Sequence, residues 1–322
     1  MARVNQIDVC HSSLAILRSL SYQSELRDNL RRTAQQALGT VPLLAATRRT
    51  DSSLFSSDKM RMASYHFEVR VFDCSIQVET ACIEAHTILD RYIFPSLPRT
   101  ANAIDQPDIS IRVVRVADQL QLLADDVMVA SVRRAIDLVP DLIRILDDAV
   151  VPRLTSLRAV HAGAVLWGER ALLLPGSTHA GKSSLVTQLL RRGATYFSDE
   201  YALIDSAGLV HPYPRPLLVR NGRPEQTPML PVEYNASVGD VPAPVGWIFS
   251  LQYLPECAWS VAAITQGEAL LTLLRNTPHI LAEKSDMVQV FERAIAGASC
   301  YVGTRNEAPD AVDKILQLVD KL

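Results

Sequence analysis

Alternating hydrophobic and polar residues predict strands from Tyr65 onward, and apolar residues at helical spacing predict two helices among them. Strands are expected at 65–71, 75–78, 108–116, 119–123 and 127–132, and helices near 80–92 and 137–154. The last two strands form a hairpin that turns at Asp125-Asp126. Residues 63–155 therefore read as a small α+β domain, which we expect to act as a scaffold or in substrate recognition.

The second half of the chain alternates short apolar strands with amphipathic helices. Strands are expected at 160–167, 171–174, 194–198, 201–205, 209–210, 247–253 and 259–263, and helices at 184–190, 266–275, 282–295 and 309–322. Six prolines between 212 and 231 predict a long loop region without central strands. This alternation indicates an α/β domain over 156–322.

The N-terminal segment, 1–62, is predicted to be an extension that is partly helical or mobile. Leucines recur at helical intervals from Leu14 to Leu38, with arginines among them, and a Ser/Thr-rich stretch follows. A basic amphipathic helix that touches a membrane or a partner is the alternative interpretation.

Composition narrows the function classes. The 322 residues carry a net charge of −3, which gives no reason to expect nucleic acid as a partner. No apolar run approaches the length of a membrane span. The five scattered cysteines contain no C-x-x-C pair and favour a reducing cytoplasm over a disulfide framework or zinc site. A homo-oligomer stays compatible with these properties.

The sharpest signal is the run Gly176 to Ser183, which matches G-x-x-x-x-G-K-[ST] between an apolar strand and a helix. Such a loop turns its backbone N–H groups around phosphate oxygens, and the helix directs its positive end at the same anion. Lys182 is expected to reach the β- and γ-phosphates of ATP, and Ser183 to bind Mg²⁺. The predicted nucleotide-binding residues are Gly176, Ser177, Thr178, His179, Ala180, Gly181, Lys182, Ser183 and Ser184.

An acidic pair, Asp199-Glu200, follows the next strand after the loop and its helix. In P-loop proteins an acid at this point holds or orients Mg²⁺, which predicts Asp199 as a second metal ligand. A neighbouring carboxylate can accept the proton of an attacking hydroxyl, which predicts Glu200 as the general base. A solvated turn is the alternative for both residues.

The order of these motifs resembles the C-terminal catalytic domain of HPr kinase/phosphorylase and the wider group of HPr-kinase-related proteins. The resemblance covers roughly 155–305 and is carried by His161-Ala162-Gly163-Ala164-Val165, the loop, Arg192-Gly193, Ser198-Asp199-Glu200 and the Pro-rich run from His211 to Leu218. It implies a P-loop kinase domain of the HPr kinase/phosphoenolpyruvate carboxykinase type.

The resemblance also implies roles. His161 falls where the family has a histidine beside its acid pair, able to orient an acid or share its proton. Arg215 is expected to act as a cationic clamp on the transferring phosphate. His179 stands where the family usually has glycine, and no counterpart of the family's later substrate-binding signature is evident.

These features together predict an ATP- and Mg²⁺-dependent kinase. Its catalytic residues are expected to be Glu200, Asp199, His161, Lys182 and Arg215. The acceptor is a hydroxyl, of the Ser/Thr kind, on a peptide, small protein or small metabolite. The alternative is a nucleotide-binding regulatory module with weak or no turnover, which the departure at His179 favours.

Overall fold

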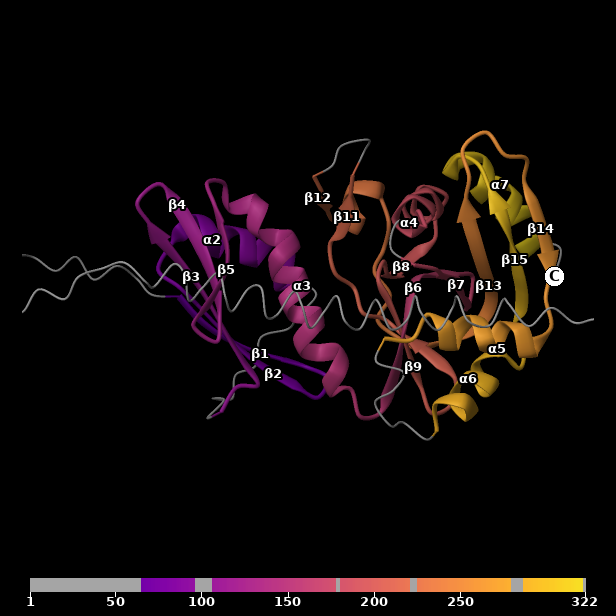
Figure 1. The fold of residues 1–322 in the computed structure, drawn as a ribbon, viewed down its shortest axis with the longest axis horizontal. Coiled ribbons are helices and arrows are strands. Elements are labelled where there is room, and N and C mark those ends of the chain that lie inside the picture. Colours follow the sequence, from indigo (N-terminus) through magenta and orange to yellow (C-terminus); the bar gives the residue numbers. More distant parts are fainter. Residues whose placement is uncertain (1–64, 96–105, 178–179, 221–224, 279–285, 321–322) are drawn as a thin grey trace, which may run out of the picture. The chain divides into compact units, whose positions relative to one another are not determined.

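The structure, a computed structural model, describes residues 65–95, 106–177, 180–220, 225–278 and 286–320 (Figure 1). The predicted extension, 1–62, and the helical pattern within it lie outside the described residues. Everything described belongs to one compact unit, residues 61–322.

The first part of the described chain forms a five-stranded sheet whose strands follow in chain order, β1-β2-β3-β4-β5. The strands are β1 (Tyr65–Val71), β2 (Cys74–Thr80), β3 (Ile109–Val116), β4 (Gln119–Ala124) and β5 (Val127–Val132). Only the β2–β3 pair is parallel. A parallel pair needs a crossover, which contains α2 (Ile83–Ile88) and a π-helical turn, Leu89–Ile93. The predicted helix near 80–92 is this crossover.

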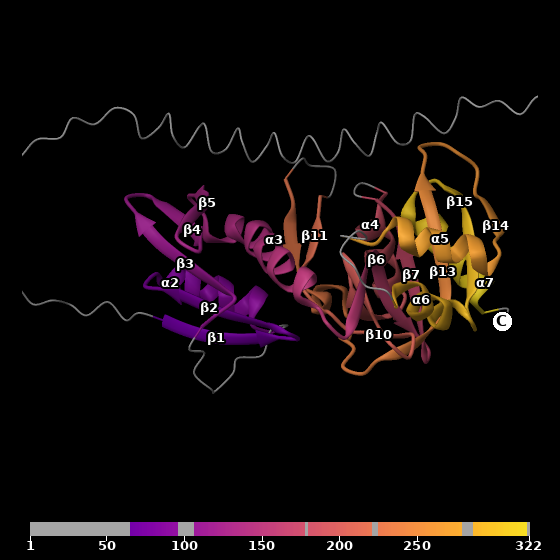
Figure 2. The same cartoon turned by 60° about the horizontal axis from the view of Figure 1, so that its bottom comes forward.

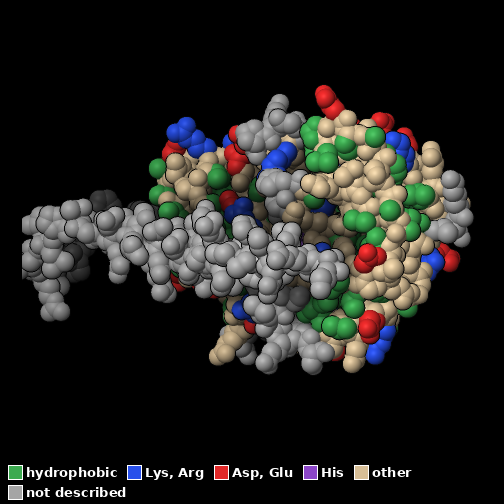
Figure 3. Space-filling view, turned by 45° about the vertical axis from the view of Figure 1, so that its right-hand side comes forward, with side chains coloured by type: hydrophobic (Ala, Val, Ile, Leu, Met, Phe, Trp, Pro, Cys, Tyr) green, Lys and Arg blue, Asp and Glu red, His purple; other side chains and the backbone are tan. Residues whose placement is uncertain are grey.

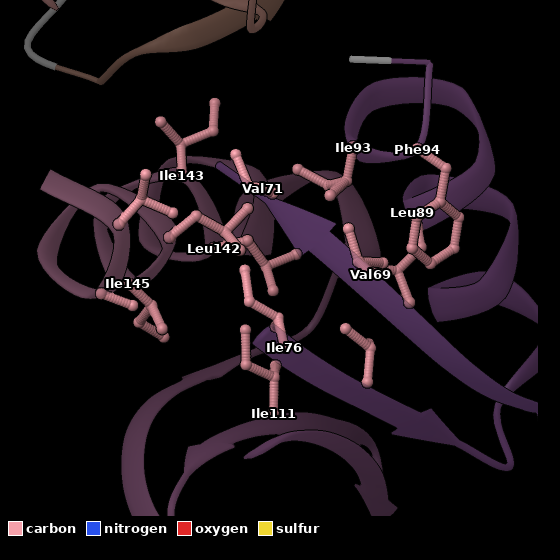
Figure 4. Close-up of a cluster of buried hydrophobic side chains, with 14 of the residues drawn as sticks. Val69, Val71, Ile76, Leu89, Ile93, Phe94, Ile111, Leu142, Ile143 and Ile145 are labelled. Carbon is pink, nitrogen blue, oxygen red and sulfur yellow. The ribbon is translucent and has the colours of Figure 1, made fainter. Parts of the chain in front are cut away.

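Helix α3 (Val139–Val150) covers this sheet and supplies seven of the buried residues of its core. Its apolar positions recur at helical spacing, and Leu142, Ile143 and Ile145 belong to one buried cluster with Val69, Ile76 and Ile111 of the strands (Figure 4). Leu203 and Tyr213, from the second half of the chain, belong to the same core. The two halves therefore share apolar packing.

An eight-stranded sheet forms the second half, with the order β10-β9-β6-β7-β13-β15-β14 and β8 beside β6. The strands are β6 (Leu157–Trp167), β7 (Arg170–Pro175), β8 (Thr195–Ser198), β9 (Tyr201–Asp205), β10 (Leu209–His211), β13 (Ala243–Tyr253), β14 (Ser260–Ala263) and β15 (Ser299–Arg305). The central strands β7, β13 and β15 run parallel to one another, and the remaining pairs are antiparallel. The described chain is thus a mixed α/β protein.

Helices cover both faces of this sheet (Figure 1). On one face lie α4 (Lys182–Arg191) and α7 (Ala308–Val319), and on the other lie α5 (Gln266–Arg275) and α6 (Met287–Ile295), which Figure 2 brings forward. Strand β7 is buried on both faces, because Leu172 and Leu174 pack toward the first helix pair and Leu173 packs toward the second. A strand buried on both faces reads as a continuous apolar run, which is the pattern at 171–174.

Two features of this half differ from the sequence expectation. Strand β15 was not predicted, because Gly303 weakens its strand pattern. A Cβ at Gly303 would lie 2.0 Å from the backbone oxygen of Ser260, so the β14–β15 approach requires glycine. The Pro-rich region also holds a separate two-stranded ribbon, β11 (Leu217–Val219) with β12 (Thr227–Met229). The division predicted near residue 155 falls between the two sheets, although both belong to one compact unit.

One face of the described surface shows no grouping of charge that would point to a particular partner. On the face shown in Figure 3, the described acidic and basic side chains lie interspersed among hydrophobic ones. Each helix in the described part of the chain is too short or too polar to cross a membrane.

Helix α6 provides a test of this packing. Phe291 is 0% exposed and Val288, on the same helix, is 44% exposed. We expect Phe291→Ala to lower the free energy of unfolding by about 3–5 kcal/mol, because it leaves a cavity between α6 and the sheet. Val288→Ala is the matched control and should change it by less than about 0.5 kcal/mol. Urea unfolding followed by circular dichroism measures both; equal midpoints would contradict the position of α6.

Candidate active site

The predicted phosphate loop connects β7, at the centre of the sheet, to the first turn of α4. The structure describes it except for Thr178 and His179, so the departure at His179 lies outside the described residues. Gly181 caps α4 with a left-handed φ of 79°. The unpaired N–H groups at the start of α4 therefore face the loop, which makes this end of the helix favourable for an anion.

Backbone hydrogen bonds bring the loop and the acidic pair to the same strand, β6. The N–H of Gly176 donates to the carbonyl of His161 at 3.3 Å. The next residue along β6, Ala162, donates its N–H to the carbonyl of Glu200 at 3.0 Å. Strand β6 thus places His161 between two segments that are distant in sequence, as the resemblance implies.

The side chain of Lys182 lies against the loop that precedes it. Its Nζ donates to the carbonyl oxygens of Gly176 at 3.1 Å and Ser177 at 3.2 Å, and it is 3.0 Å from Nε2 of His161. The residue is 8% exposed. Burial lowers the pKa of Lys182, and the charges of Glu200 and Asp199 oppose that shift.

Oε1 of Glu200 lies 2.6 Å from Nε2 of His161. Burial raises the pKa of Glu200, but the hydrogen bond from His161 and the charges of Arg215, His161 and Lys182 outweigh it, so the pKa is lowered overall. An ionised carboxylate only accepts hydrogen bonds, so Nε2 carries the proton and donates to Glu200. Nε2 then cannot accept from Lys182, whose third N–H remains available to a phosphate oxygen.

Asp199 is more deeply buried than Glu200, with 4% of its surface exposed. Burial raises the pKa of Asp199 to about 7, and a hydrogen bond from Ser183 and the charge of Arg215 only partly oppose this. Its Oδ1 has no hydrogen-bond partner. A buried carboxylate oxygen without a partner, beside a serine hydroxyl, is a pair of hard oxygen donors suited to Mg²⁺.

No cluster of three or more His, Cys, Asp or Glu side chains suited to a metal occurs among the described residues. The protein would therefore supply only two ligands to a Mg²⁺ here, the carboxylate of Asp199 and the hydroxyl of Ser183. Mg²⁺ sites of this kind are completed by waters and substrate phosphates.

Arg215 lies next to Glu200, on the side away from the cleft. Its Nη2 is 3.8 Å from Oε2 of Glu200, and its Nη1 donates to Oδ2 of Asp147, on α3. It is not among the described residues that line the cleft at the loop. Its expected role as a clamp on phosphate therefore stays a prediction, and it would require a movement of the side chain.

Sequence reasoning missed Arg305, at the end of β15. Its Nη2 donates to the carbonyl oxygens of Ala180 at 3.3 Å and Gly181 at 3.0 Å, and its guanidinium lies 5.0 Å from the ring centre of Tyr253. The residue is 2% exposed. Arg305 therefore fixes the end of the phosphate loop, and no local motif marks it in the sequence.

A cleft of about 520 Å³ opens at the start of α4. This volume is within the usual range for sites that bind small molecules. Its described lining comprises Gly181, Lys182, Ser183, Ser184, Glu200, Leu218, Val219, Arg220, Gln226, Tyr253, Arg305, Glu307 and Ala308. The structure thus brings the loop residues and Glu200 together around one cavity, with strand β11 as a further wall.

No protein-family model matches the chain, and no curated protein matches it in sequence.

The buried Asp199 predicts an unusual pH dependence of stability in metal-free protein. The pKa is 3.8 when the group is solvated and about 7 in the folded state, an interval that corresponds to about 4 kcal/mol. Between these values the folded state holds a proton that the unfolded chain has released. This contribution to stability therefore falls as pH rises from 4 to 7. We expect Asp199→Asn to be more stable than the unaltered protein at pH 8 and nearly equal to it at pH 4.

Asp205→Asn is the matched control, because burial raises the pKa of Asp205 but hydrogen bonds from His211 and two backbone N–H groups lower it overall. That variant should be less stable than the unaltered protein at pH 7, and the difference should vanish as pH falls below 3.8 through the lowered folded-state pKa. Urea unfolding from pH 3 to 8 with EDTA measures both variants. A destabilised Asp199→Asn at pH 8 contradicts the burial of an uncompensated carboxylate.

Gly181 tests the contact between the loop and Arg305. A Cβ at Gly181 would lie 2.0 Å from Nη2 of Arg305, whereas one at Gly168, also at positive φ, would meet nothing within 4 Å. Gly168→Ala should therefore lower the free energy of unfolding by only about 1–2 kcal/mol, the cost of a left-handed alanine. Gly181→Ala should cost at least about 1 kcal/mol more, because it displaces the guanidinium from its carbonyl partners.

The contact between Gly181 and Arg305 also predicts that the losses of stability in Gly181→Ala and Arg305→Ala are not additive. Arg305→Ala should remove the extra cost of Gly181→Ala, so the double variant loses less stability than the sum of the single variants. Thermal unfolding of the four proteins measures this. Additive losses would show that Gly181 and Arg305 act independently.

Proposed function

We propose that this protein is an ATP- and Mg²⁺-dependent kinase that transfers the γ-phosphate to a hydroxyl, of the Ser/Thr kind, on a peptide, small protein or small metabolite. The observation that carries the proposal is the contact of Glu200 with His161 beside Lys182, at the open end of a glycine-containing loop. This contact places Glu200, a proton acceptor, in the same cleft as Lys182 of the phosphate-binding loop. We further infer a P-loop kinase domain of the HPr-kinase-related type, located in the cytoplasm.

Phosphate binding is assigned to the loop, the start of α4 and Lys182. The helix end supplies N–H donors without side-chain charge, and Lys182 adds a full positive charge. The carbonyl oxygens of Gly176 and Ser177 hold the ammonium at the cleft before any ligand enters. Lys182 therefore needs little reorganisation to donate to the β- and γ-phosphates.

Ser183 and Asp199 would hold the Mg²⁺. When bound there, Mg²⁺ neutralises charge on the phosphates and orients them for in-line attack. The cost of burying Asp199 as an anion falls when a cation lies beside it. Asp199 is thus the group in the site that gains most from a bound cation.

Glu200 accepts the proton of the attacking hydroxyl. The acceptor's O–H bond breaks, its oxygen forms a bond to the γ-phosphorus, and the bond to the β-phosphate oxygen breaks to release ADP. His161 donates to Oε1 of Glu200, so it fixes the carboxylate and supports its ionised form. Glu200 lines the cleft, where an acceptor hydroxyl can reach it.

Two substitutions separate binding from transfer. Lys182→Ala removes the charge on the phosphates, and we expect at least about 100-fold slower transfer. Glu200→Gln removes the base but keeps its size, so transfer should fall by about 100- to 10,000-fold while MgATP binding persists. Lys314→Ala, on α7, and Glu169→Gln, in an exposed turn, make the same chemical changes away from the cleft and should have no effect.

The assay uses γ-labelled ATP, Mg²⁺ and a cell extract as the source of acceptors, with MgATP binding followed separately by calorimetry. Label on an acceptor that appears with the unaltered protein and both controls, but with neither site variant, supports the kinase. Binding of MgATP without any transfer contradicts it and favours the regulatory module. Absence of MgATP binding contradicts both.

A further inference from the structure

A continuous series of polar side chains leads from the phosphate loop to the helix that covers the first sheet. Lys182 neighbours His161, His161 donates to Glu200, Glu200 faces Arg215, and Arg215 donates to Asp147 on α3. The last residue, Asp147, precedes the other four in sequence and belongs to the part of the chain read as a scaffold. Its position calls for an explanation, because the rest of this helix face is apolar.

Asp147 is 7% exposed and lies in an apolar layer with Ile143 and Leu146 of the same helix. Both of its oxygens are used: Oδ1 accepts from the hydroxyl of Tyr213 at 3.1 Å, and Oδ2 accepts from Nη1 of Arg215. Burial raises the pKa of Asp147 to about 6, although the charge of Arg215 lowers it. A buried ion pair often stabilises a fold no better than apolar side chains of the same volume do. Stability is therefore a weak reason for an aspartate here.

The geometry of Arg215 gives a stronger reason. Its side chain is 10% exposed, and its Nε has no hydrogen-bond partner. The backbone carbonyl of Arg215 accepts from the hydroxyl of Tyr196 at 2.8 Å, which fixes the main chain at this point. Because a guanidinium is planar and rigid, the bond from Nη1 to Asp147 determines where Nη2 lies. Nη2 is the group that faces Glu200.

Glu200 is thereby held from two sides. His161 donates to Oε1 at 2.6 Å, and Nη2 of Arg215 lies 3.8 Å from Oε2. At 3.8 Å the guanidinium contributes charge without a short hydrogen bond, which leaves Oε2 able to accept a proton. Without Asp147, the guanidinium is free to move onto Oε2 and occupy it.

We propose that Asp147 is a positioning residue for the phosphoryl transfer: by holding Arg215, it fixes the carboxylate of Glu200 and keeps Oε2 open to the acceptor hydroxyl. This role rests on the proposed kinase function. It gives α3, the helix that covers the first sheet, a part in positioning the active site. Asp147 itself touches neither nucleotide nor acceptor.

The test is Asp147→Asn, which keeps the size of the side chain and removes its charge, with Asp148→Asn as control. Asp148 is the next residue on α3 and is exposed, so it undergoes the same change without the contact to Arg215. Misplacement of a catalytic group by about 1 Å costs about 100-fold in rate. We expect kcat of Asp147→Asn to fall by about 10- to 100-fold, with KM for MgATP within about twofold, because the phosphate loop is untouched. Asp148→Asn should change neither.

A second variant keeps the test valid if Asp147→Asn folds poorly. Arg215→Gln removes the group through which Asp147 acts, and the double variant Asp147→Asn/Arg215→Gln leaves no unpaired buried charge. In the Arg215→Gln background, Asp147→Asn should produce no further fall in kcat. A spectroscopic readout is independent of turnover: the imidazole signals of His161, in histidine-labelled protein, should shift in Asp147→Asn and not in Asp148→Asn.

The outcomes are distinct. Transfer by the unaltered protein with equal kcat in Asp147→Asn overturns the positioning role and leaves the kinase in place. A further fall in kcat when Asp147→Asn is added to Arg215→Gln overturns the route through Arg215. A rise in KM with unchanged kcat overturns it as well, since it assigns Asp147 to nucleotide binding. No transfer by the unaltered protein overturns the proposed function and this role with it.

Discussion

Ionised groups are buried beside the predicted phosphate loop, and this burial determines how the side chains around them are arranged. An isolated charge in a protein interior costs several kcal/mol, so each one here must be opposed by another or by hydrogen bonds. Lys182 lies near Glu200, and Glu200 lies near His161 and Arg215. Removal of any member leaves its neighbour uncompensated. The side chains of the site therefore behave as a coupled group, and their positions are set together.

The cost of burial is offset for some of these charged groups and not for others. The groups for which it is not offset indicate where a ligand would bind. The hydrogen bond from His161 and the positive charges around Glu200 more than offset its burial, so its pKa is lowered. Asp199 is not offset, since its pKa is raised and Oδ1 has no partner. Lys182 has one N–H left after its bonds to the two loop carbonyls, because Nε2 of His161, which donates to Glu200, cannot accept it. An excess acceptor on Asp199 and an excess donor on Lys182, whose charges interact, would complement a cation bound to a phosphate.

The sequence was informative where function depends on neighbours in the chain. The loop from Gly176 to Ser183 and the pair Asp199-Glu200 stand out in the sequence because each is a short local motif. The structure places described residues of the loop and Glu200 around one cleft. The meeting of His161 with Glu200 was expected only from the resemblance, since no pattern in β6 distinguishes a site histidine from a core one. The strands and helices flanking these motifs were predictable because their apolar periodicity is regular.

Arg305 and Asp147 could not be predicted, for a physical reason. Arg305 contacts the carbonyl of Gly181 across 124 positions, and Asp147 contacts Arg215 across 68. Such pairs depend on how strands and helices are arranged in three dimensions. Strand β15, which carries Arg305, was itself missed, because Gly303 weakens the strand pattern and only the close approach of β14 explains that glycine.

Helix α3 contacts both halves of the chain, so the boundary near residue 155 does not separate two independent domains. That boundary separates two sheets, but Leu203 and Tyr213 of the second half pack into the core of the first. Tyr213 also donates to Asp147, so the apolar packing and the ion pair form at one place on the helix. A shift of α3 against the second sheet would therefore move Asp147 and Arg215 together. Because the guanidinium is planar and rigid, such a shift would move Nη2 relative to Glu200. The first sheet would then influence the carboxylate, although none of its described residues lines the cleft.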